Sequence, residues 1–223
     1  MKTKIIATIH WRYSLKKIKD IVSEGAGIIR INTKYTPFEE YPYLARKVRK
    51  AKAEIMIDFK DRRELKKIAE LDFDYLAVSF SESEEEILKI KGRFPEKKII
   101  SKIESKKGVS NADSLIRVSY GIMIARGDLG RDIAIEKIPF IQRTITRECK
   151  KKKKMSILAT EIMPSMVKEK RPTRAEVSDI ANAILEGNNA LLLAQETAIG
   201  KYPELAVKTL KKVIKETEKE MAS

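Results

Sequence analysis

The sequence is short of cysteine and of aromatic residues, and each shortage excludes a class of protein. Cys149 is the only cysteine among 223 residues, so no disulfide can form within the chain, and a reducing, cytoplasmic location is expected. Aromatic side chains make up 6% of the chain, and neither a basic helix nor an aromatic RNA-binding motif accompanies the basic residues. We therefore expect no nucleic-acid partner.

Long apolar runs and acidic residues are also scarce. The amino-terminal segment MKTKIIATIHWRYS has too short an apolar core for a signal peptide, and no run reaches the length of a membrane span, so no membrane partner is expected. The 47 basic residues outnumber the 32 acidic ones, which favours attraction of small anions. Glutamine occurs only twice beside abundant lysine and glutamate, a bias that resembles thermophilic proteins.

Eight short apolar runs rich in β-branched residues alternate with charged segments of helical period. Strands are expected at residues 4–9, 28–32, 54–59, 75–80, 97–103, 121–126, 155–160 and 190–195. Helices are expected at residues 14–24, 37–52, 61–71, 82–93, 134–153, 174–186 and 203–221. This order predicts an α/β fold, a single (β/α)8 TIM barrel that spans residues 1–223 as one domain. A doubly wound sheet is the alternative, but its glycine-rich loop is replaced by HWRY after the first strand.

The functional residues of such a barrel lie at the carboxyl ends of its strands. Polar residues follow nearly every predicted strand, whereas the amino-terminal ends show no comparable set. Lys102 and Glu104 are two residues apart and share a face, and Asp128 is expected at the same height on the next strand. A lysine and two carboxylates suit Mg²⁺ or Mn²⁺ with an anionic substrate. A buried structural salt bridge is the alternative.

Four motifs resemble the barrel of pyruvate kinase, in order and with similar separations: IISKIESKKGV, GIMIARGDLG, RPTRAEVSDIANAILEG and ETAIGKYPELAV. The shorter matches KIIATI and GIIRIN extend the resemblance to the amino terminus. It implies a Mg²⁺-dependent glycolytic enzyme that transfers a phosphoryl group between phosphoenolpyruvate and ADP. The expected small-molecule partner is thus a 2-oxo acid or its enol phosphate.

The resemblance also implies a role for individual residues. Lys102 matches the active-site lysine that stabilises the phosphoryl group and the enolate. Glu104 and Asp128 match the Mg²⁺ ligands, and Gly127 and Asp128 match the backbone segment that holds the substrate carboxylate. Thr160 matches the threonine near the methylene carbon, which delivers a proton, through water.

Further matched positions lie on the second and third strands. Arg30 matches the arginine that contacts the transferred phosphoryl group. Asn32 and Asp58 match two ligands of the family's potassium site, but Lys34 and Phe59 replace the other two. We expect the Lys34 ammonium to stand in for the monovalent cation, so that K⁺ is not required.

Other segments depart from the family. The family's third strand leads into a separate lid domain, whereas here DFKDRRELKKIAEL runs directly into a helix, and the chain ends at Ser223 without the family's carboxyl-terminal domain. We therefore expect a barrel alone. The segment HWRYS replaces the family's first loop, and His10 there is either a general base or a packing residue. Glu161 beside Thr160 either disturbs nucleotide binding or caps the next helix.

These departures leave three functions open. Kinase activity is expected to be weak without the lid, and the sequence does not decide whether ADP or ATP binds. The same enolate site also suits a Mg²⁺-dependent lyase or decarboxylase of 2-oxo acids. A non-catalytic barrel that binds a metabolite or a partner is the third. The motif RPTRAEVSD lies near a subunit contact in the family, which allows a homodimer.

Overall fold

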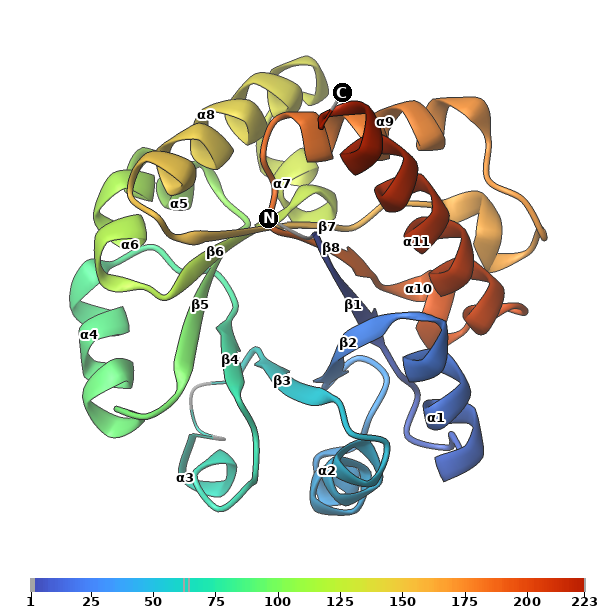
Figure 1. The fold of residues 1–223 in the computed structure, drawn as a ribbon. Helices are drawn as coiled ribbons and strands as arrows, with labels where there is room; N and C mark the ends of the chain where they lie inside the picture. The colour runs from blue at the N-terminus through green and yellow to red at the C-terminus, as the bar shows by residue number, and fades with distance from the viewer. Residues whose placement is uncertain (1–2, 62, 64, 223) are drawn as a thin grey trace.

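The computed structural model describes residues 3–61, 63 and 65–222, and it confirms the closed (β/α)8 barrel. The strands pair in parallel in chain order, and β1 closes the sheet against β8 (Figure 1). Their bounds are β1 Lys4–Thr8, β2 Ala26–Asn32, β3 Glu54–Phe59, β4 Tyr75–Val78, β5 Lys98–Ile103, β6 Gly121–Ala125, β7 Met155–Ala159 and β8 Ala190–Leu193. Each lies within three residues of its predicted limits.

Helices surround the barrel, as Figure 1 shows. The longer ones are α1 Leu15–Glu24, α2 Tyr41–Lys50, α4 Glu84–Arg93, α8 Ile138–Lys151, α9 Arg174–Leu185 and α11 Pro203–Glu220. The shorter ones are α3 Leu65–Ile68, α5 Lys106–Ser110, α6 Ala112–Val118, α7 Arg126–Asp132 and α10 Gln195–Ala198, with 3-10 turns η1 Phe38–Glu40, η3 Ile135–Lys137 and η4 Pro164–Val167. The predicted helix at 61–71 is therefore shorter than expected, and residues 62 and 64 lie outside the described residues.

Local signals set the limits of several helices. Ser14 caps α1 by accepting a hydrogen bond from Lys17 N, and Gly25 ends the helix with a φ of 130°, which glycine tolerates best. Thr173 and Glu176 form a reciprocal capping box at the start of α9. These caps determine at which residues α1 and α9 begin and at which residue α1 ends.

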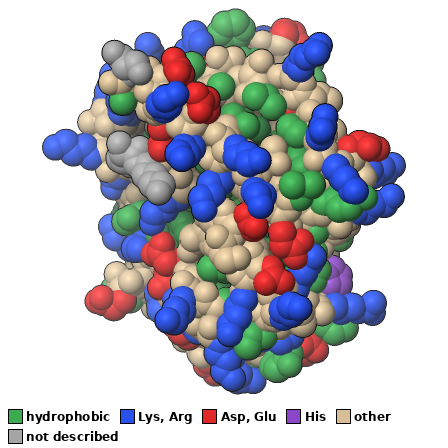
Figure 2. All heavy atoms as spheres, turned by 45° about the vertical axis from the view of Figure 1, so that its right-hand side comes forward, with side chains coloured by type: hydrophobic (Ala, Val, Ile, Leu, Met, Phe, Trp, Pro, Cys, Tyr) green, Lys and Arg blue, Asp and Glu red, His purple; other side chains and the backbone are tan. Residues whose placement is uncertain are grey.

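The surface is rich in basic side chains. Figure 2 shows lysine and arginine side chains spread over the side that carries α1 and α11, with smaller groups of acidic side chains between them. None of the helices in the described part of the chain combines the length and the apolar composition that crossing a bilayer requires.

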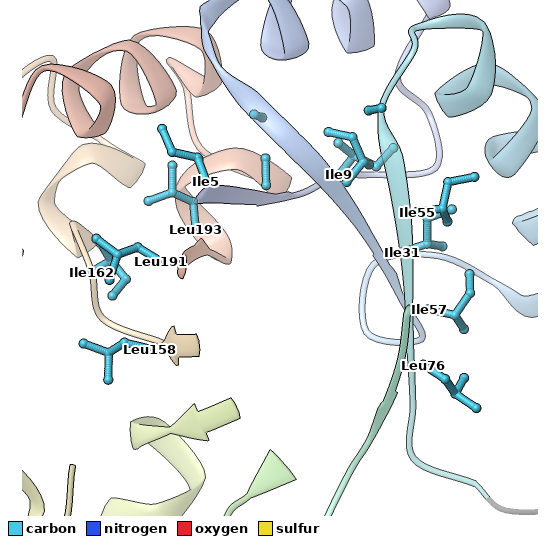
Figure 3. Close-up of a cluster of buried hydrophobic side chains, with 14 of the residues drawn as sticks. Ile5, Ile9, Ile31, Ile55, Ile57, Leu76, Leu158, Ile162, Leu191 and Leu193 are labelled. Carbon is cyan, nitrogen blue, oxygen red and sulfur yellow. The ribbon is translucent and has the colours of Figure 1, made fainter. Parts of the chain in front are cut away.

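The core has two parts, one on each face of the closed sheet. Between the strands and the helices lie apolar side chains such as Ile55, Ile57 and Leu76 (Figure 3). Inside the barrel, Ile6, Met56, Ile100 and other apolar residues form a separate buried cluster. Since alternate residues of a strand face opposite sides, Met56 and Asp58 point inward while Ile55 and Ile57 point outward.

The amino-terminal end of the barrel also carries a polar cluster, so the expectation that it has no such set is wrong. The Lys4 and Lys98 ammonium groups each lie 3.1 Å from a carboxylate oxygen of Glu54, and the Tyr75 hydroxyl donates to the same carboxylate at 3.2 Å. Burial raises the pKa of Glu54, but its bonds to Lys4 and Lys98 have the larger effect, and the net pKa is lowered. These residues begin their strands; the Lys4, Glu54 and Lys98 side chains keep contact with water, whereas Tyr75 is buried.

Candidate functional site

A buried charged cluster lies at the carboxyl end of β3, β4 and β5. The Lys102 ammonium lies 3.1 Å from Asp58 Oδ1 and 3.1 Å from Glu104 Oε1, and it donates to Ser79 Oγ at 2.9 Å. The side chains of Lys102, Asp58 and Glu104 are 4%, 1% and 1% exposed. Lys102 and Glu104 thus meet, as their spacing predicted.

Arg30 of β2 completes the cluster from the other side of Asp58. Its Nε and Nη2 lie 2.8 Å and 2.6 Å from Asp58 Oδ2, and its Nη1 donates to Thr8 Oγ1 at 2.9 Å. Thr8 was not anticipated, although it follows inward-facing Ile6 by two residues on β1. Two cations therefore face two carboxylates, which is the balance that buried charges require.

The two carboxylates of the cluster differ in their electrostatics. Burial raises the pKa of Asp58, but Lys102 and Arg30 outweigh this effect, and the net pKa is lowered. Burial also raises the pKa of Glu104, and because the nearby Asp58 carboxylate opposes the Lys102 charge, the net pKa stays raised. Asp58 is thus the fixed counter-charge of the two cations.

The two carboxylate oxygens of Glu104 have different surroundings. Its Oε2 accepts a hydrogen bond of 2.7 Å from Phe80 N, and Phe80 itself has a left-handed φ of 48°. Its Oε1 is buried and accepts no hydrogen bond within the described structure, although the Lys102 ammonium lies beside it. The Phe80 contact could not be found from the sequence, because it uses a backbone N–H.

Gly127 and Thr160 form a second pair, at the ends of β6 and β7. Gly127 N donates to Thr160 Oγ1 at 2.9 Å, and the same hydroxyl donates to the Ala159 carbonyl. Thr160 and Glu161 have φ values of 69° and 54°. Such left-handed residues each cost about 1–2 kcal/mol when they are not glycine. The turn after β7 is therefore held in place by its surroundings.

Asp128 does not lie where it was expected. It occupies the first turn of α7, because a helix begins at Arg126 directly after β6, and the prediction that it continues the strand is wrong. Its side chain is 32% exposed, and its Oδ1 lies 3.7 Å from Arg131 Nη1. Among the described residues no hydrogen bond or ion pair joins Asp128 to Lys102 or Glu104.

The donors present fit a divalent metal ion held by few protein ligands. Within residues 3–61, 63 and 65–222, no group of three or more histidine, cysteine, aspartate or glutamate side chains gathers to hold a metal ion. Mg²⁺ often takes one or two carboxylates and fills its other positions with water and substrate oxygens. The carboxylate of Glu104, whose Oε1 faces the Lys102 ammonium, and the partly exposed carboxylate of Asp128 are hard oxygen donors of the required kind.

The residues matched to the potassium site are partly engaged. Asn32 and Asp58 are register partners on β2 and β3, and Asn32 Oδ1 accepts a hydrogen bond of 2.9 Å from Lys34 N. Lys34 is exposed, and its ammonium lies 5.4 Å from the centre of the Tyr35 ring. No ion pair joins Lys34 to Asp58 in the described part of the chain, so the proposed charge replacement stays a prediction.

In the described part of the chain, neither His10 nor Glu161 makes a hydrogen bond or ion pair with Arg30, Asp58, Lys102 or Glu104. His10 Nδ1 accepts a hydrogen bond from Arg12 N, and its ring stacks 5.9 Å from that of Trp11. Partial burial, together with Arg12, lowers the pKa of His10.

The helix after Glu161 is capped by Thr173, and no side chain caps η4, so the alternative that Glu161 caps the following helix is wrong.

Comparisons with known proteins agree with this architecture. Residues 53–207 match the family described as "Pyruvate kinase, barrel domain". The chain is 46% identical over 164 residues to a pyruvate kinase of Methanocaldococcus jannaschii and 48% identical over 164 residues to one of Thermotoga maritima. A pyruvate kinase of Clostridium perfringens is 41% identical over 164 residues.

These alignments cover 71–72% of this chain but only 35–37% of the relatives. The chain therefore spans about a third of the length of these curated relatives. The matched segment includes β3 to β8, and with them Asp58, Lys102, Glu104, Gly127 and Thr160. On this evidence the chain belongs to the pyruvate kinase family and contains its barrel domain.

Proposed function

We propose that this chain is a Mg²⁺-dependent enzyme of the pyruvate kinase type that binds phosphoenolpyruvate or pyruvate and stabilises the enolate between them. The observation that supports this most is the buried cluster of Arg30, Asp58, Lys102 and Glu104 at the carboxyl end of the family's barrel. Cations held in place before the substrate arrives stabilise developing negative charge without reorganisation.

Each site residue has a separate task in this proposal. The Lys102 ammonium faces the enolate oxygen, and the Arg30 guanidinium contacts the transferred phosphoryl group. Gly127 and Asp128 hold the substrate carboxylate, and Thr160 delivers the proton to the methylene carbon, through water. Glu104 and Asp128 would hold Mg²⁺ (or Mn²⁺), which supplies Lewis-acid stabilisation of substrate oxygens.

A second candidate is an enolate enzyme that does not use a nucleotide. It is favoured by the short connection of residues 60–64 between β3 and α3, the position at which the resemblance places a nucleotide lid. Without such a lid, ADP is poorly positioned and water is poorly excluded, which slows phosphoryl transfer. Decarboxylation of oxaloacetate or an aldol-type cleavage would still use Lys102. A non-catalytic barrel has no need of this buried lysine.

The test is the exchange of pyruvate methyl protons, measured by NMR in heavy water with Mg²⁺. We expect exchange by the wild-type chain, and about a 100-fold loss in Lys102→Ala, because one donor to a developing oxyanion contributes that much. Glu104→Gln should raise the Mg²⁺ requirement. Lys107→Ala is the matched control, since Lys107 is 67% exposed and should leave the rate unchanged.

Calorimetric titration with phosphoenolpyruvate, pyruvate, oxaloacetate and ADP then separates the candidates. Binding of ADP together with phosphoenolpyruvate supports the kinase, whereas binding of 2-oxo acids alone supports the enolate enzyme. Exchange no faster than the buffer background would refute both. Repeating the exchange in K⁺ and in Na⁺ tests Lys34: equal rates are expected, and a steep increase with K⁺ would contradict its role.

A further inference from the structure

Arg126 joins the end of β6 to the turn that carries Thr160. Its Nε and Nη2 donate to the Thr160 carbonyl at 3.1 Å and 2.9 Å, and its Nη2 also donates to the Glu161 carbonyl at 2.8 Å. Its Nη1 lies 2.7 Å from Asp179 Oδ2 on α9. The arginine side chain is only 12% exposed. One guanidinium thus binds two carbonyls of the turn and one carboxylate of a helix.

The turn that Arg126 binds is one that the sequence disfavours. Thr160 and Glu161 both have left-handed φ values, of 69° and 54°, and for a β-branched residue such as Thr160 this is an outlier. Strained residues persist only where their surroundings fix them. Arg126 supplies hydrogen bonds to both strained residues, and the Thr160 hydroxyl consequently lies beside Gly127 N at 2.9 Å.

The chemistry of this contact requires arginine and its aspartate. The planar fork of a guanidinium binds several acceptors at fixed angles, whereas a lysine ammonium is a flexible point charge. Asp179 binds the remaining guanidinium nitrogen, Nη1, and the aspartate side chain is 39% exposed. In the described part of the chain, Arg126 makes no hydrogen bond or ion pair with Lys102 or Glu104. Changes at Arg126 or Asp179 therefore leave the charged cluster in place.

We propose that Arg126, held by Asp179 of α9, is a positioning residue that fixes Thr160 for proton delivery to the bound enolate. The role given to Thr160 rests on the proposed function, but the positioning by Arg126 does not. Loosening the turn displaces the Thr160 hydroxyl, while Lys102 still binds the substrate. A displacement of about 1 Å can slow a reaction about 100-fold. Proton transfer should consequently suffer more than binding.

The experiment compares Asp179→Asn and Arg126→Lys with the wild-type chain. The rate of pyruvate methyl exchange should fall about 10-fold or more in each variant, whereas the calorimetric affinity for pyruvate with Mg²⁺ should change much less. Asp113→Asn is the matched control, because it removes an exposed aspartate of α6 whose ion pairs are with Arg117, at 2.8 Å, and with Lys152, neither of which is a site residue. Wild-type rates in both variants, or equal losses of rate and affinity, would overturn the proposal.

A second measurement does not depend on activity. Gly127 N donates to Thr160 Oγ1, so its amide resonance in ¹⁵N-labelled protein without ligand reports the position of the hydroxyl. The resonance should move in Asp179→Asn but not in Asp113→Asn. An unmoved resonance would refute positioning by Arg126. If the wild-type chain shows no exchange, the proposed function fails, and the Gly127 resonance alone then decides the role of Arg126.

Discussion

Asp58 is the residue on which the charged cluster depends. It lies between Arg30 and Lys102, 2.6 Å from a guanidinium nitrogen and 3.1 Å from the ammonium, and its side chain is 1% exposed. Burying two cations is costly unless a carboxylate faces both. A single side chain from β3 thus keeps cations from β2 and β5 at the same end of the barrel.

Replacing this carboxylate should be strongly destabilising. We expect Asp58→Asn to lower the free energy of unfolding by about 3–5 kcal/mol, because it leaves two buried cations facing one remaining carboxylate. Urea unfolding followed by circular dichroism measures the change. Ser79→Ala is the control, since it removes a neutral hydroxyl from the same cluster and should cost about 1 kcal/mol. Equal losses in the two variants would show that charge balance is not the cause.

At this scale the sequence predicted some contacts of the site and missed others. The spacing of Lys102 and Glu104 predicted their meeting, because both side chains face into the barrel. The predicted position of Asp128 was wrong, because the alternating pattern of a strand does not reveal that a helix begins at Arg126. Two features were missed: the hydrogen bond from Phe80 N to Glu104 and the left-handed φ of Thr160. Both depend on backbone angles that long-range contacts impose.

Among the elements, α9 is tied to the loop that follows β7 by its first turn. The Glu176 carboxylate accepts hydrogen bonds from Ser165 N at 2.8 Å, Ser165 Oγ at 2.5 Å and Thr173 N at 2.6 Å. Burial raises the pKa of Glu176, but these donors outweigh it, and the net pKa is lowered. Glu176 thus holds Ser165 and Thr173. Asp179, one turn later, holds Arg126, which binds the carbonyls of Thr160 and Glu161.

The lowered pKa of Glu176 predicts a pH dependence of stability. A carboxyl whose pKa is lower in the folded chain stabilises it fully above the unfolded-state pKa of about 4.3, and this stabilisation is lost as the pH falls through the folded pKa. We expect Glu176→Gln to lower the free energy of unfolding by about 1 kcal/mol at pH 7. The difference from wild type should shrink at pH 3. Glu169→Gln, an exposed change in the same connection, should have little effect at either pH.

The strands were easier to predict than the helices. Strands such as β8 are buried on both faces, so an uninterrupted apolar run marks them. Short helices such as α7 and α10 are too brief to show a helical period, and each begins within two residues of the end of a strand. The eight strands with their longer helices were therefore predictable, whereas α7, which carries Asp128, and α10 were not.

Over the whole molecule, the excess of positive charge acts against the compact state. The chain carries a formal charge of +15 at pH 7, and basic side chains are spread over the face shown in Figure 2. Surface ion pairs such as Lys17 with Glu204 at 2.5 Å oppose this repulsion locally. Exposed pairs contribute little each, about 0–1 kcal/mol, so the net charge should dominate the response to salt.

Salt should consequently stabilise this protein at neutral pH. Raising NaCl from 0.01 to 0.15 M shortens the screening length from about 30 Å to about 8 Å, which weakens repulsion across the molecule more than attraction within an ion pair. We expect the melting temperature at pH 7 to rise by about 3 °C, equivalent to about 1 kcal/mol for a chain of this size. Near the isoelectric point of about 9.7 the net charge vanishes, and the increase should vanish with it. A melting temperature that falls with salt at pH 7 would show instead that the surface ion pairs outweigh the net charge.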